Sequence, residues 1–122
     1  MSALIIVTAT VFAFLIVLST NVIRVRRSEG VTLGDNGNER VIRAMRAQAN
    51  FAEYAPFILI GLALLALNED DPNYILALGF WFVLTRGIHF VSMAFGVWFP
   101  GRVIGTFGAF STLITTIIIL TI

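Results

Sequence analysis

Four long apolar runs dominate this sequence and limit it to a fold in lipid. They cover about residues 3–23, 40–67, 73–99 and 103–122, and each supplies the roughly 20 residues that a helix needs to cross a hydrocarbon core. Of the 122 residues, 58% are hydrophobic and only 12% are charged, whereas about a quarter are charged in a soluble domain. Lipid leaves no backbone polar group unpaired and the sequence shows no barrel-like alternation. The sequence therefore predicts one all-α domain, residues 1–122, built as a transmembrane four-helix bundle.

The segments between the runs differ in charge, and this difference predicts the orientation of the chain. Arg102 precedes the fourth run, and six arginines separate the first two runs: Arg24, Arg26, Arg27, Arg40, Arg43 and Arg46. The loop NEDDPN, residues 68–73, is acidic and carries no base. Arginine-rich loops stay in the cytoplasm, so we expect both termini on the opposite side. The compact loops and the absence of lysine favour a bacterial inner membrane.

Several features exclude other kinds of protein. No basic segment precedes the first run and no small-residue cleavage site follows it, so we interpret it as a retained span and not as a signal peptide. There is no cysteine and only one histidine, His89, so neither a disulfide nor a metal site is expected. No phosphate loop or nucleic-acid signature is present, and we expect no nucleic-acid partner.

Two local signals concern the ends and the packing of the helices. Either Asn38 or Asp35 could cap the helix that begins near residue 40. Gly101, Gly105 and Gly108 would let the fourth run pack closely against a neighbour.

Polar side chains follow one face of the second run and enter the membrane with it. At about 100° per residue, this face carries Glu39, Arg43, Arg46, Asn50, Glu53 and Phe57. The third run also has polar residues at depth, namely Arg86, His89 and Ser92. At about 1.5 Å per residue from the acidic loop, Glu53 and Arg86 both lie roughly 20 Å deep, and Asn50 and His89 roughly 25 Å deep. Neighbouring antiparallel helices would then bring Glu53 level with Arg86, and Asn50 level with His89.

These polar residues allow two interpretations. Glu53 and Arg86 could form a structural ion pair that fixes helix register, because a charge at the bilayer centre costs at least about 2.5 kcal/mol and is usually paired or functional. The second interpretation starts from the four polar residues that such a pair would leave in the arginine-rich half of the membrane. They predict a wet, net-positive pocket for a small anionic ligand, and they are Arg46, Asn50, His89 and Arg102. We interpret Arg43 as an interfacial residue that extends toward water. Tyr54 lies too deep for an aromatic belt, which favours a functional role.

The stretch ERVIRAMRAQANFAEYAPFIL resembles the second helix of the MAPEG family, the membrane-associated proteins in eicosanoid and glutathione metabolism. The family pattern is an Arg, an Asn four residues later, a Glu three after that, then an aromatic residue and soon a Pro. In this sequence the pattern is matched by Arg46, Asn50, Glu53, Tyr54 and Pro56. The resemblance extends over nearly the whole chain.

The resemblance implies a homotrimer in membrane lipid, with glutathione as co-substrate bound between subunits near the cytosolic face. Arg46, Asn50, Glu53 and Tyr54 match its glutathione-binding positions. Arg86 and His89 match an Arg and a His of the prostaglandin synthase branch. Arg102 resembles the residue held to stabilise the glutathione thiolate. One of Arg24, Arg26 and Arg27, with Arg26 favoured, would match an arginine that reaches a glutathione carboxylate.

The departures from the pattern bear on the expected activity. Met93 stands where some members have a further Tyr, and Val103 and Thr106 replace polar residues of the synthase branch. A general glutathione transferase that conjugates apolar electrophiles is therefore favoured over a prostaglandin synthase. Two alternatives remain open: a non-catalytic membrane protein that binds lipid or glutathione, and a structural subunit whose polar stripe sets trimer register.

Overall fold

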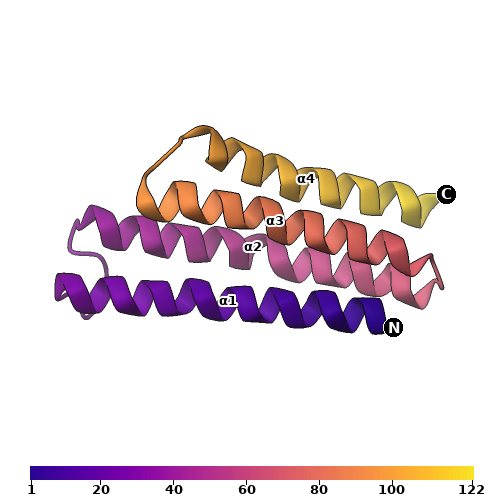
Figure 1. Cartoon of the computed structure of the whole chain (residues 1–122), viewed down its shortest axis with the longest axis horizontal. Coiled ribbons are helices and arrows are strands. Elements are labelled where there is room, and N and C mark those ends of the chain that lie inside the picture. Colours follow the sequence, from indigo (N-terminus) through magenta and orange to yellow (C-terminus); the bar gives the residue numbers. More distant parts are fainter.

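The computed structural model describes all 122 residues as four α-helices joined by short turns (Figure 1). The helices are α1 (Ser2–Glu29), α2 (Glu39–Leu67), α3 (Pro72–Phe95) and α4 (Pro100–Thr121). Each is long and apolar enough to cross a membrane. The prediction of an all-α bundle with four spans is confirmed.

Local signals set the ends of the first two helices. Gly30 adopts φ 67°, and the N–H of Val31 donates to the carbonyl of Arg26 at 3.0 Å, which closes α1. The N-cap of α2 is Asn38, whose side chain accepts from the N–H of Val41 at 3.1 Å. Asp35 instead accepts from the N–H of Gly37 within the preceding turn. Of the two candidate caps, Asn38 is therefore the one used.

The helix bounds differ from the expected spans mainly at the ends of α1 and α3. α1 continues past residue 23 to Glu29, because nothing in the arginine-containing turn interrupts the helix before Gly30. α3 ends at Phe95 and not at residue 99, because Gly96 takes a left-handed conformation with φ 64°. The next turn brings Pro100 to the start of α4, where its missing N–H does no harm.

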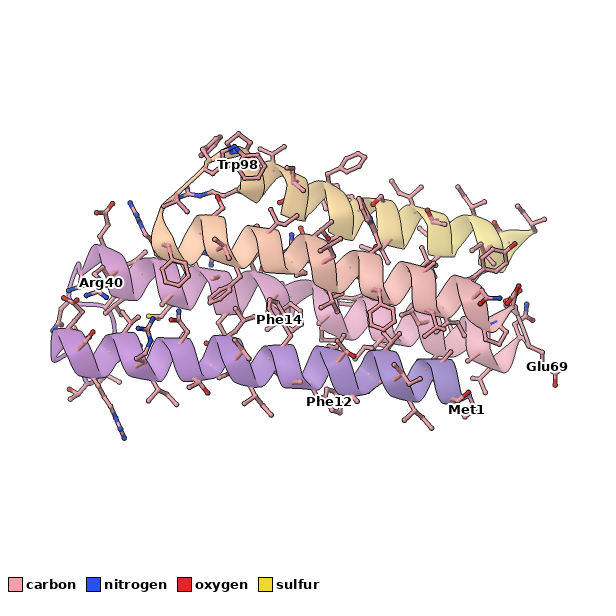
Figure 2. The ribbon with its side chains drawn as sticks, viewed as in Figure 1. Met1, Phe12, Phe14, Arg40, Glu69 and Trp98 are labelled. Carbon is pink, nitrogen blue, oxygen red and sulfur yellow. The ribbon has the colours of Figure 1, made fainter.

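The helices α2 and α3 form the centre of the bundle. Each packs against both α1 and α4, while α1 and α4 do not touch each other. Stacked and edge-on aromatic rings fill the middle: Phe14 lies 5.0 Å from Phe51, and Phe51 lies 5.7 Å from Phe82. Figure 2 shows Phe14 pointing into the bundle and Phe12 pointing away from it, as expected for α1 at the edge of the molecule.

Pro56 interrupts the hydrogen bonding of α2 without ending the helix. A proline has no N–H, so it cannot bond to the carbonyl of Ala52 four residues earlier. Both residues are exposed, so the missing hydrogen bond lies on an outer side of α2.

Glycines let α4 approach α3 closely, as the sequence predicts. A Cβ on Gly101 would stand 2.7 Å from the Cβ of Ser92, and one on Gly105 would stand 2.9 Å from Nη2 of Arg86. At Gly108 it would collide with the side chain of Thr85. The backbone of α4 thus lies directly on the polar residues of α3.

This close packing predicts a difference between two Gly→Ala variants. Gly108→Ala should destabilise the bundle by about 1–3 kcal/mol, because the added methyl overlaps Thr85. Gly87→Ala has open space around the new methyl and should be neutral or stabilising by about 0.5 kcal/mol. Melting temperatures in the same detergent compare the two. Equal stability of both variants would contradict the packing of α4 on Thr85.

Candidate functional site

Arg86 lies at the centre of the bundle and is only 1% exposed. It comes from the middle of α3, and its Nη1 donates a hydrogen bond to Oδ1 of Asn50 on α2. Its guanidinium carbon stands 5.4 Å from the centre of the Tyr54 ring, which is close enough for a cation–π interaction. The remaining N–H groups, on Nε and Nη2, have no acceptor within the chain. Arg86 is therefore a buried cation with hydrogen-bond donors that no group of the chain accepts.

No carboxylate neutralises Arg86, so the interpretation of Glu53 and Arg86 as a structural ion pair within one chain is wrong. The ion pairs of the chain are Arg40–Glu29 and Arg43–Glu39, both near the arginine-rich end. The reason is the direction in which α2 presents its side chains. Asn50 and Tyr54 are four residues apart, share one side of α2 and meet Arg86. Glu53 is rotated away from that side and is exposed.

His89 lies one turn after Arg86 on α3 and is 3% exposed. It packs against the backbone of α4 at Gly105, where a Cβ would stand 2.9 Å from its Cγ. Asn50 bonds to Arg86 and not to His89, although depth counting places Asn50 and His89 at one level. Tyr54 is half-buried and packs edge-on against Phe110 of α4, with ring centres 6.0 Å apart. Phe110 has no distinguishing signal in the sequence, because it lies in an ordinary apolar run.

Arg102 lies in the first turn of α4, close to the turn that joins α3 and α4. Its guanidinium carbon is 5.5 Å from the ring centre of Phe99, and its Nε is buried without an acceptor. Ser92 holds this turn, because its Oγ donates to the carbonyl of Trp98 at 2.7 Å. Figure 2 shows Trp98 at the outer edge of the turn. Arg102 borders an apolar hollow of about 360 Å³ that none of the other predicted site residues lines.

The open face of α2 carries Arg46 and Glu53, both exposed, and the half-buried Asn50. None of the five main cavities of the chain is lined by Arg46, Asn50, Glu53 or His89. Of the four residues expected to share a net-positive pocket, only Arg102 lines one of these cavities, so a single copy of the chain does not by itself enclose Arg46, Asn50, His89 and Arg102 together. The polar face of α2 points outward, where neither α1 nor α4 covers it, while His89 points into the packed interior.

The arginines of α1 lie apart from the Arg86 cluster. Nη2 of Arg26 donates to the sulfur of Met45 at 3.2 Å, and Nη1 of Arg26 is buried without an acceptor. Arg24 is exposed and donates to Oδ1 of Asn21 at 2.9 Å. Arg43 packs against the end of α3, where a Cβ on Gly96 would stand 3.3 Å from its Nη2. No local pattern predicts that contact, because residue 96 is far from residue 43 along the chain.

Comparison with known proteins connects this arrangement to one family. Residues 4–122 match the model of the MAPEG family, which is essentially the whole chain. No curated protein and no solved structure matched the sequence. The four apolar helices agree with that family's bundle architecture. The chain therefore belongs to the MAPEG family and is an integral, multi-pass membrane protein of the kind that serves glutathione and eicosanoid metabolism.

Proposed function

We propose that this protein is a glutathione transferase that joins the glutathione thiolate to apolar electrophiles dissolved in the bilayer. The observation that carries the proposal is Arg86: a buried guanidinium without a carboxylate partner and with two nitrogens that lack an acceptor. Burial of an unpaired charge costs several kcal/mol. An anionic ligand that reaches Arg86 would offset this penalty, and glutathione, with two carboxylates and an ionisable thiol, is such a ligand.

The open face of α2 supports assembly into a homotrimer. Glu53 lies roughly 20 Å from the acidic loop, counted at about 1.5 Å per residue, and its side chain is exposed. Such a charge facing hydrocarbon costs at least about 2.5 kcal/mol. A second copy that covers this face would remove Glu53 and Arg46 from lipid. The same contact would enclose a ligand between the subunits, beside Asn50 and Arg86.

In this proposal the residues divide into positioning and chemical roles. The tripeptide is held by Arg46, Asn50, Glu53, Tyr54, Arg86 and His89, and an arginine of α1, with Arg26 favoured, reaches one glutathione carboxylate. Arg102 favours the thiolate over the thiol, because a nearby cation in a partly dehydrated site lowers a thiol pKa from its ordinary value near 8.5. The thiolate sulfur forms a bond to the electrophilic carbon, and the leaving group departs with its bonding electrons.

The proposal includes the placement of the protein in the membrane. The arginine-rich end of the bundle faces the cytoplasm, both termini lie on the other side, and the membrane is a bacterial inner membrane. Arg40, at the arginine-rich end, and Glu69, in the acidic loop, lie at opposite ends of the molecule (Figure 2). This separation supports the assignment, because basic loops are retained in the cytoplasm.

A second candidate function is a non-catalytic lipid-binding protein. An apolar groove of about 520 Å³ between α1 and α3 favours it. The groove is lined by Phe14 of α1, by one side of α3 and by the turn that follows α3, and Gly87 leaves open space in α3 beside it. The lining residues of α3 and the turn are Val83, Leu84, Gly87, Ile88, Val91, Ser92, Val97 and Trp98.

Thermal stabilisation by glutathione tests the proposed site. Protein purified in a neutral detergent should melt at a higher temperature with glutathione, by the equivalent of about 2.7 kcal/mol at a hundredfold excess over the Kd. It should also conjugate a chlorinated aromatic compound faster than glutathione alone. Glycine at the same ionic strength controls for salt effects. An unchanged melting temperature rejects the site, and stabilisation without conjugation favours the binding protein.

A further inference from the structure

A cationic hollow lies at the end of α1, apart from the Arg86 cluster. It has a volume of about 370 Å³ and is lined by Ile23, Arg26, Arg27, Gly30, Val31 and Thr32. Two of these six residues are arginines and none is acidic. The left-handed turn at Gly30 ends α1, and the next two residues, Val31 and Thr32, line the hollow together with the arginines.

The arginines of this hollow lack an anionic partner. Arg26 donates only to the thioether of Met45, a weak acceptor, and its Nη1 is buried without any acceptor. Arg27 makes no ion pair. The nearby carboxylate of Glu29 is engaged by Arg40 and, at 2.9 Å, by the amide of Asn38. The hollow is thus lined by two arginines whose charge no carboxylate of the chain neutralises.

A simpler explanation accounts for only part of this arrangement. Arginines in the last turn of a helix interact favourably with its dipole and extend toward the membrane surface. That explains a preference for positive charge at residues 26 and 27. It does not explain why Nη1 of Arg26 is buried beside a hollow with no acceptor, since an extended arginine keeps its head group in water.

The chemistry and depth of the hollow point to a phosphate group. We propose that Arg26 and Arg27 form a site for a phosphate group at the membrane surface. Arginine forks match phosphate oxygens in paired hydrogen bonds. Arg27 lies four residues past Ile23, the end of the first apolar run, or about 6 Å at 1.5 Å per residue. The headgroup layer adds about 5–8 Å to each side of the hydrocarbon core, so the hollow lies level with lipid phosphates.

This site goes beyond the proposed transferase activity and gives Arg26 a partner other than glutathione. Basic pockets beside transmembrane helices bind the head groups of anionic lipids. A lipid phosphate and a free phosphate share the chemistry that the two arginines recognise, and the experiment below separates these sources.

The test uses the full-length protein without glutathione, in phosphatidylcholine nanodiscs with and without phosphatidylglycerol, and separately in neutral detergent titrated with inorganic phosphate. The variant R26Q/R27Q removes the two arginines of the hollow. Arg24→Gln is the matched control, because it removes a charge from the same helix turn outside the hollow. Equal melting temperatures of all variants in pure phosphatidylcholine show that the variants fold.

The proposal predicts at least a tenfold loss of phosphatidylglycerol binding in R26Q/R27Q and less than a twofold loss in Arg24→Gln. Native mass spectrometry of the retained lipid measures both. Stabilisation by phosphatidylglycerol identifies a lipid as the source of the phosphate, and stabilisation by inorganic phosphate alone identifies a soluble one. The proposal is overturned if neither phosphatidylglycerol nor inorganic phosphate binds. It is also overturned if removal of Arg24 lowers binding as much, per arginine removed, as removal of Arg26 and Arg27, because diffuse surface charge would then explain the binding.

Discussion

Arg86→Met is expected to raise the melting temperature of the ligand-free protein and to abolish its stabilisation by glutathione. The guanidinium is 1% exposed and has no carboxylate partner, so its charge destabilises the folded chain. A methionine of similar length fills the same space without a charge. Replacing buried charges by apolar residues of similar volume stabilises proteins by about 1–4 kcal/mol in favourable cases. Thermal unfolding with and without glutathione measures both effects.

Arg43→Met is the control for this experiment. Arg43 has an exposed partner, Glu39, at 3.0 Å and lies near the membrane surface, where an ion pair contributes about 0–1 kcal/mol. Arg43→Met should change neither the melting temperature of the ligand-free protein nor its stabilisation by glutathione strongly. A lower melting temperature for ligand-free Arg86→Met would mean that a neighbouring subunit supplies an anion to Arg86. Retained stabilisation by glutathione would show that the ligand binds elsewhere.

Arg102→Ala is expected to lower kcat for conjugation of a chlorinated aromatic compound by about 100-fold, as for loss of one group that stabilises developing charge. The binding of glutathione should change little, because this arginine acts on the sulfur and not on the peptide. Arg102→Lys should restore part of the activity, since a cation remains. Steady-state kinetics measures kcat, and calorimetry measures the Kd of glutathione.

The ultraviolet absorbance of bound thiolate separates a chemical role from a structural one. In Arg102→Ala this absorbance should appear only at higher pH than in the unsubstituted protein, because the cation that lowers the thiol pKa is gone. Arg40→Ala, which removes an exposed arginine from the end of the bundle, should leave the pH profile unchanged. Full turnover by Arg102→Ala would end the assignment of thiolate stabilisation to this residue.

The fold could be predicted because the signals for it are local. A run of about 20 apolar residues specifies a membrane helix without knowledge of its neighbours. Asn38 also acts locally, because its side chain caps the helix that follows it, and the glycines of α4 leave room for a close neighbour, which in the structure is α3. The end of α3 was misplaced because Gly96 lies in an apolar segment that continues through Phe99, and hydropathy alone does not register a left-handed turn.

The candidate site was harder to predict, because counting residues gives depth and not direction. Glu53 and Arg86 share a depth, yet the next residue, Tyr54, is the one whose ring faces the guanidinium. A rotation of about 100° between consecutive residues decides which of them meets α3 and which remains outside. The packing of α2 against α1 and α4 sets that rotation, and such packing depends on the whole bundle.

Pro56 changes the hydrogen bonding on an exposed side of α2. Pro56 has no N–H to donate to the carbonyl oxygen of Ala52. This oxygen therefore lacks its usual helical hydrogen bond, and it lies one residue before Glu53. Hydrocarbon tails cannot satisfy either acceptor. A ligand amide, an ammonium group or a neighbouring subunit's donor can satisfy both. The carbonyl that Pro56 leaves without its helical donor is therefore better satisfied in the membrane by a neighbour with N–H or O–H groups than by hydrocarbon.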